Sequence, residues 1–191
     1  MAEKGIEIET VQIDLAAGEQ FEDSFRAINP DCVVPALELD NGACLSEVVA
    51  ICHYLDAMYP EPALMGTTDQ EKANILMWNS KVEQQGLSAV ADAFRNSATG
   101  LKDRAMTGLV AYPQIPELAA RGRGRLEQFF QKLDRQLAEN EHVAGDGYSM
   151  ADISAMVVVD FSAWIKVPLS EDFAHAHRWY EAVSSRPSAV A

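Results

Sequence analysis

The chain has 191 residues, of which 48% are hydrophobic and 23% charged, as in an ordinary soluble globular protein long enough to form a real core. Its formal net charge of −14 argues against nucleic acid and anionic membrane surfaces as partners, because both bind clustered Lys and Arg. No segment approaches the roughly 18 apolar residues of a membrane span, and the first residues lack the apolar region of a signal peptide, so we expect a cytoplasmic protein.

The first thirty residues predict a strand and a short helix. Residues 6–15 are rich in Ile, Val and Thr, which favour a strand. Phe21, Phe25 and Ile28 follow at helical spacing, so they predict one apolar face of a short helix. That helix should end near Pro30, because the residue before a proline disfavours helical geometry.

A hairpin and a second helix come next. Residues 33–39 predict a strand, and the Asp-Asn-Gly sequence at 40–42 predicts a hairpin turn, because Asn and Gly tolerate positive φ. Residues 43–45 complete the hairpin. Ser46 is the predicted cap of the following helix, whose apolar stripe ends at Tyr59.

Beyond Pro62 the pattern predicts helices alone. The first extends from 69 to about 96 and contains Gly86. Glycine lowers helix stability by roughly 1 kcal/mol, so we expect close packing or a kink at that position. Pro116 suits the first residue of the next helix, because the missing N–H of proline would have no partner there.

The strongest local signal in the second half is a capping box at 149–152, Ser-Met-Ala-Asp. The helix after it is apolar on nearly every side, so it should run through the middle of a helical domain. A last helix is predicted near 172–184. The Pro-rich segment 60–68 marks a domain boundary, and we predict domains at 1–60 and 69–191.

The cysteines exclude some classes of chemistry. Cys32, Cys44 and Cys52 form no Cys-x-x-Cys pair, which disfavours a thioredoxin-like reductase. Their odd number fits a reduced cytosolic setting. Neither they nor the four histidines show the spacing of zinc ligands, so no metal is expected.

Three segments resemble glutathione transferases. Residues 29–39, Asn-Pro-Asp-Cys-Val-Val-Pro-Ala-Leu-Glu-Leu, resemble the segment that leads into the family's cis-proline. Residues 45–51, Leu-Ser-Glu-Val-Val-Ala-Ile, are similar to its Leu-Thr-Glu-Ser-x-Ala-Ile signature, and residues 145–153 resemble the capping motif of its helical domain. The resemblance implies an α/β plus all-α fold, in which a thioredoxin-like domain precedes a helical bundle of the family's C-terminal type.

The resemblance also implies an N-terminally shortened first domain. Family members begin with a strand and a helix ahead of the segment matching residues 3–7, and the turn between them carries the Tyr, Ser or Cys that stabilises the glutathione thiolate. We expect this strand and most of this helix, about 15–20 residues, to be absent. The chain is then a fragment or a gene with a misplaced start, or the strand 6–15 fills the empty slot, or a second chain covers the exposed edge.

The resemblance assigns a glutathione-binding site to four residues. The backbone of Val34, before Pro35, would pair with the cysteinyl part of glutathione. The helix tip at Val48 would bind the γ-glutamyl carboxylate, and Glu47 would face the ammonium group. Val48 stands where the family has Ser, and the lost hydrogen bond costs about 1.5–3 kcal/mol, so glutathione binding and activity should be impaired.

Two further sets of residues are candidates for chemistry. Residues 93–101 resemble a helix end in a bacterial and fungal class without a standard N-terminal catalytic residue, where the helical domain stabilises the thiolate. Asn96 and Ser97 are therefore catalytic candidates, with helix capping as the alternative. Three aromatic residues are candidates for an acceptor pocket, with core packing as the alternative: Trp78, Phe94 and Trp164.

Together these features imply a glutathione S-transferase-like protein that conjugates glutathione to a hydrophobic electrophile, as in detoxification. Glutathione is then a substrate, and no cofactor is needed. By resemblance we also expect a homodimer. The alternative is a non-catalytic dimerisation or interaction module with the same fold.

Overall fold

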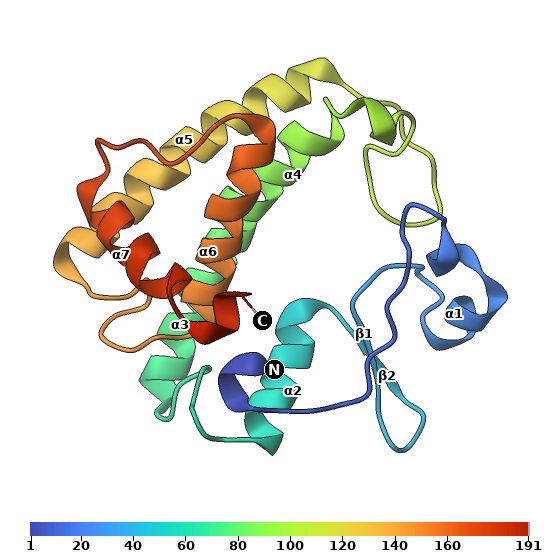
Figure 1. Ribbon diagram of the computed structural model, residues 1–191, viewed down its shortest axis with the longest axis horizontal. Helices are drawn as coiled ribbons and strands as arrows, with labels where there is room; N and C mark the ends of the chain where they lie inside the picture. The colour runs from blue at the N-terminus through green and yellow to red at the C-terminus, as the bar shows by residue number, and fades with distance from the viewer. Residues whose placement is uncertain (191) are drawn as a thin grey trace. The chain divides into compact units, whose positions relative to one another are not determined.

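The computed structural model describes residues 1–190, and the chain divides into two compact units (Figure 1). Unit 1 comprises Met1–Pro62 and Met106–Tyr112, and unit 2 comprises Ala63–Ala105 and the chain from Pro113 onward. Among residues 1–190, no helix has both the length and the apolar character needed to cross a membrane.

Unit 1 is built around a short antiparallel hairpin and a helix. Its elements in chain order are a 3₁₀ turn at Ala2–Lys4, a second at Glu19–Phe21, α1 at Asp23–Ile28, β1 at Ala36–Glu38, β2 at Cys44–Ser46 and α2 at Val48–Met58. Leu37 lies opposite Leu45 in the ladder, and Gly42 has a φ of 79° in the turn. The predicted hairpin and second helix are therefore confirmed, with strands shorter than the apolar runs indicated.

The predicted cap of α2 is wrong. Ser46 is the last residue of β2 and pairs with Ala36, so its backbone belongs to the ladder and not to a helix start. Glu47 occupies the cap position with a φ of 68°, and its side chain makes no capping hydrogen bond.

The predicted strand at 6–15 is also wrong, because this segment has no regular secondary structure. Within the described chain the hairpin forms a sheet of two strands, and neither pairs with residues 6–15. Residues that favour strands do not form a stable strand unless a neighbouring strand pairs with them. The segment is anchored instead by Ile6, which is buried, while Val11 is 77% exposed. The expected shortening of the domain stays a prediction.

Lys4 ties the start of the chain to the end of α2. Its Nζ lies 2.7 Å from Asp56 Oδ1, and it donates to the carbonyl oxygens of Tyr59 at 2.7 Å and Pro62 at 2.5 Å. The Lys4 side chain is only 4% exposed, so this charge is almost wholly enclosed by its three partners.

The longer elements in the described part of unit 2 are all helices, as predicted beyond Pro62, and irregular loops join them. Its longer elements are α3 at Asp69–Lys81, a π-helical segment at Val82–Leu87, α4 at Ser88–Arg95, α5 at Pro116–Glu139, α6 at Met150–Ser162 and α7 at Ala174–Ser184 (Figure 1). Short 3₁₀ segments occur at Thr99–Leu101, Ala163–Ile165 and Pro187–Val190.

Glycines allow two close approaches in the helical core. A Cβ on Gly86, inside the π-helical segment, would lie 2.9 Å from a methyl group of Val158 and 3.0 Å from the Phe129 ring, which confirms the expected close packing. On α5, a Cβ on Gly122 would lie 2.6 Å from the carbonyl oxygen of Ala89 on α4. These two contacts set how closely α5 and α6 pack on the first long helix.

The predicted capping box is present, and its acid has a second role. Asp152 is fully buried and accepts hydrogen bonds from the backbone N–H and hydroxyl of Ser149 at 3.0 and 3.1 Å. It also accepts from the N–H of Val143 at 2.9 Å and from Trp179 Nε1 at 2.8 Å. One carboxylate therefore joins the start of α6 to the preceding loop and to α7.

Candidate functional site

The hairpin register brings together the two segments predicted to bind a ligand. Because Ala36 pairs with Ser46, Pro35 and Glu47 are the next residues beyond the same end of the hairpin. Paired residues in an antiparallel ladder have Cα atoms about 4.5–5.5 Å apart, so the residues just beyond start from neighbouring positions. The Val34-Pro35 peptide bond is cis, as the resemblance implied. We call Val34, Pro35, Glu47 and Val48 the cradle.

The tip of α2 gives the cradle its electrostatic character. The first intrahelical bond at this end runs from the N–H of Ile51 to the carbonyl of Glu47 at 3.1 Å, so the N–H groups of the first turn have no helical acceptor. Such a tip carries a partial positive charge and binds carboxylates. Val48 is 44% exposed and Val34 is 41% exposed, so both sides of the cradle are accessible.

Asn29 positions the loop that leads into the cradle. Its side chain is buried, with Nδ2 donating to the carbonyl of Val33 at 2.8 Å and Oδ1 accepting from the N–H of Asp31 at 3.2 Å. Its own carbonyl accepts from the N–H of Cys32, which has a φ of 56°. In the sequence, Asn29 stands out only as part of the motif at 29–39. An Asn before a Pro is a turn signal in a sequence. The hydrogen-bond partners of its side chain, however, depend on the path of the loop.

Gln20 is a second polar residue of unit 1 that the sequence analysis missed. Its side chain is buried, and its amide oxygen has no hydrogen-bond partner among the described residues. A buried acceptor without a donor is costly, so such groups in native structures call for an explanation such as a ligand or a water molecule. A single Gln between a turn and a helix carries no sequence signal for this burial.

The structure commits Asn96 and Ser97 to contacts within unit 2. Asn96 is buried; its Nδ2 donates to the carbonyl of Asp92 at 2.9 Å, and its Oδ1 accepts from the N–H of Ile115 at 2.9 Å. Ser97 Oγ donates to the carbonyl of Ala93 at 2.6 Å. These bonds favour helix capping, the alternative that the sequence left open.

Two of the three predicted acceptor residues lie together. The Phe94 and Trp164 rings are 5.7 Å apart, and Phe161, which the sequence analysis did not single out, lies 5.3 Å from the first and 5.1 Å from the second. Trp164 is 69% exposed, so this aromatic cluster reaches solvent. Trp78 belongs to the buried core of unit 2, and a cation–π contact joins its ring to Lys81 Nζ at 4.1 Å.

The cysteines and acids of the described chain offer little other chemistry. Burial raises the pKa of the Cys52 thiol, which lowers the thiolate fraction at neutral pH. Cys32 is buried, with its Sγ directed to the carbonyl of Pro30. Among residues 1–190, no group of His, Cys, Asp and Glu is arranged to hold a metal ion.

Comparison with known proteins places both halves of the chain in one family. The model of the glutathione S-transferase N-terminal domain matches residues 1–58. The model of the glutathione S-transferase C-terminal domain matches residues 102–187.

Curated relatives agree along nearly the whole chain. Glutathione S-transferase 2 of Saccharomyces cerevisiae is 34% identical over 190 residues, which cover 98% of this chain and 79% of the yeast protein. Glutathione S-transferase F10 of Arabidopsis thaliana is 27% identical over 191 residues, which cover 97% of this chain and 85% of the plant protein.

Solved structures share the fold. A glutathione S-transferase domain-containing protein from Marinobacter aquaeolei VT8 superposes with a TM-score of 0.90 at 35% identity, covering 98% of this chain and 90% of that one. Gtt2 from Saccharomyces cerevisiae superposes with a TM-score of 0.83 at 35% identity, covering 93% of this chain and 83% of that one.

Proposed function

The chain belongs to the glutathione S-transferase family, and from that premise we propose that it conjugates glutathione to an electrophilic small molecule. It is by resemblance an enzyme of that family, with a thioredoxin-like N-terminal domain and a helical C-terminal domain. In the proposed reaction the glutathione sulfur forms a bond to an electrophilic carbon, a leaving group such as halide departs, and the thiol proton goes to solvent. Glutathione is the substrate, and no cofactor is required.

The observation that supports this proposal is the cradle at the end of the hairpin. The backbone of Val34 has no hydrogen-bond partner among the described residues, so it can pair with the extended cysteinyl part of glutathione. The N–H groups at the α2 tip suit the γ-glutamyl carboxylate. Glu47 is exposed beside them and supplies a negative charge for the ammonium group.

We propose that this protein binds glutathione more weakly than it would with a serine in place of Val48. Val48 presents two methyl groups where a hydroxyl would donate to the carboxylate. The missing charge-assisted hydrogen bond corresponds to about 1.5–3 kcal/mol, or roughly ten- to hundredfold in affinity. Reduced activity follows, because less enzyme carries glutathione at a given concentration.

The aromatic cluster of Phe94, Phe161 and Trp164 is the proposed acceptor surface in unit 2. Its Trp164 ring is exposed and packs against the half-buried Phe94 and Phe161, so the cluster offers apolar area for a hydrophobic electrophile. Trp78 is enclosed in the core, so we assign it to packing. For Asn96 and Ser97 the helix-capping role is proposed, because a bond to a thiolate would replace bonds that they already make.

We further propose a cytoplasmic homodimer that acts on toxic electrophiles. The support for a homodimer is membership of the glutathione S-transferase family. Light scattering coupled to size exclusion gives the mass directly, and a monomer of 20.9 kDa would contradict this part of the proposal.

Turnover of a generic aryl halide with glutathione tests the activity. We expect glutathione-dependent conjugation, with KM for glutathione raised about tenfold in Glu47→Gln and unchanged in Glu38→Gln, an exposed acid of β1 outside the cradle. Immobilised glutathione should retain Glu38→Gln as well as wild type and should retain Glu47→Gln less. A folded dimer that neither binds glutathione nor turns over would instead support the non-catalytic interaction module.

A further inference from the structure

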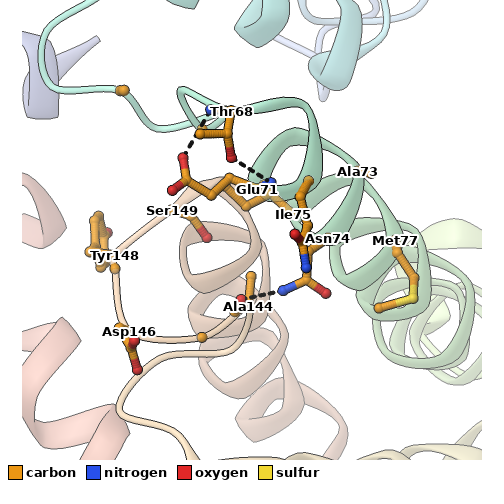
Figure 2. A pocket seen from close by; sticks show the side chains of 15 residues that line it. Thr68, Glu71, Ala73, Asn74, Ile75, Met77, Ala144, Asp146, Tyr148 and Ser149 are labelled. Atoms are coloured by element: carbon orange, nitrogen blue, oxygen red, sulfur yellow. Dashed lines mark hydrogen bonds between the residues drawn. The ribbon is translucent and has the colours of Figure 1, made fainter.

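A pocket of about 860 Å³ lies within unit 2, and no residue of the cradle or of the aromatic cluster lines it. It occupies the space between the first turns of α3 and the loop 144–149 that leads into α6, as Figure 2 shows. The segment that joins Pro62 to α3 contributes Ala63, Gly66 and Thr68. Sites for small molecules typically have volumes of about 300–1,000 Å³, so this pocket has room for one.

The pocket walls are negatively charged. Glu71 on α3 and Asp146 on the loop carry carboxylates, and the residues that line the pocket include no Lys, Arg or His. Hydrogen bonds from the hydroxyl and N–H of Thr67 and the N–H of Thr68 lower the pKa of Glu71 to about 2, so it is ionised at every physiological pH. All three bonds go to Oε2.

Apolar and aromatic side chains complete the lining. Ala73, Ile75 and Met77 on α3 contribute to the lining, and Tyr148 lies on the opposite loop (Figure 2). The Tyr148 ring already takes part in a cation–π contact, with the guanidinium carbon of Arg186 3.9 Å from its centre. Aromatic rings are the usual partners of organic cations.

The pocket is held open by hydrogen bonds between its two walls and within the loop. Asn74 Nδ2 on α3 donates to the carbonyl of Ala144 across the pocket (Figure 2). His142 and Gly145 exchange two backbone hydrogen bonds, at 2.8 and 3.2 Å, and close the turn before the loop. A pocket formed in this way needs little reorganisation to bind a ligand.

We propose that this pocket is a second ligand site, which takes a small organic cation: an amine whose ammonium group is attracted by Glu71 and Asp146 and whose apolar part contacts Tyr148. Anions are disfavoured by the same carboxylates. Glutathione carries a net negative charge at neutral pH, so it is excluded here and the site is independent of the cradle.

Tryptamine and indole-3-acetate are suitable probes, because they share an indole body and carry opposite charges. In a ¹⁵N-labelled sample of the full chain, tryptamine should shift the amide resonances of Ala73, Gly145 and Gly147. Indole-3-acetate should bind at least tenfold more weakly. Raising the salt concentration to about 0.5 M should weaken tryptamine binding several-fold, because both carboxylates are near solvent.

Three variants locate the site. Ala73→Trp fills the pocket from an exposed helix position and should weaken tryptamine binding at least tenfold. Asp146→Lys reverses one wall charge on an exposed loop and should weaken it about tenfold. Ala182→Trp adds the same bulk at an exposed position of α7 outside the pocket and should leave binding unchanged.

Three results would overturn the proposal. If tryptamine shifts resonances elsewhere, or binds wild type and Asp146→Lys equally, the pocket is not its site. If indole-3-acetate binds as tightly as tryptamine, the pocket does not select cations. Asp146→Lys lies on an exposed loop, so it keeps the test decisive even if Ala73→Trp fails to fold. Glutathione conjugation has no part in these readouts, so either proposal can fail alone.

Discussion

Replacing Val48 by serine should strengthen glutathione binding. The change places a hydroxyl on the first residue of α2, beside the N–H groups that are proposed to hold the γ-glutamyl carboxylate. A hydrogen bond to a charged group contributes about 1.5–3 kcal/mol. Because position 48 is 44% exposed, water competes for the carboxylate, and we expect the lower end of this range, about tenfold in Kd.

The cost of Val48→Ser to the fold should be small. Serine and valine have similar helix propensities. Fully burying a valine side chain contributes about 1.5–3 kcal/mol, and this one is nearly half exposed, so the loss is about 1 kcal/mol. A fall of a few degrees in Tm is the corresponding result, and it leaves the protein folded for binding measurements.

Isothermal titration with glutathione measures the effect directly. Val11→Ser is a matched control, because Val11 is an exposed valine of unit 1 outside the cradle. We expect Kd to fall about tenfold for Val48→Ser and to stay unchanged for Val11→Ser. An unchanged Kd in both variants would refute the placement of the carboxylate at the α2 tip.

Three further changes test the supports of the fold. Lys4→Met leaves the Asp56 carboxylate enclosed without its cation and should lower the free energy of unfolding by about 3–5 kcal/mol in urea, with partial recovery in the double variant that adds Asp56→Asn. Asp152→Ala removes the acceptor of Trp179 Nε1 and three other donors, so we expect at least about 3 kcal/mol lost, or failure to fold, in the same assay. Glu71→Gln tests a pH dependence: because folding lowers the pKa of Glu71 from 4.5 to about 2, wild type should be more stable than Glu71→Gln above pH 4.5, and the difference should vanish as pH falls towards 2. A difference independent of pH would contradict the last of these.

Local signals in the sequence predicted much of the fold. The Asn-Gly turn fixes the hairpin, because glycine reaches a φ of 79° at Gly42 without a clash. The Ser-x-x-Asp pattern at 149–152 fixes the start of α6, because both halves of a capping box lie within one turn. Pro116 begins α5 for a similar reason. Each of these signals depends on a few consecutive residues, so the sequence alone is enough to predict its structure.

Features that depend on distant partners were not predictable. Residues 6–15 have strand composition, but no described strand lies beside them to complete a ladder. Asn29 and Gln20 have ordinary sequence contexts, and their burial is set by the loops that fold over them. Phe161 joins Phe94 only because α6 lies beside α4, a relation that helical periodicity does not give.

The proposed cradle is tested most directly by titrating ¹⁵N-labelled protein with glutathione and following backbone amide resonances. The largest shifts should occur at Val34 and at Val48 and its neighbours at the α2 tip, with a smaller effect at Ala36. Shifts confined to unit 2, or none at millimolar glutathione, would contradict the assignment of this hairpin end as the glutathione site.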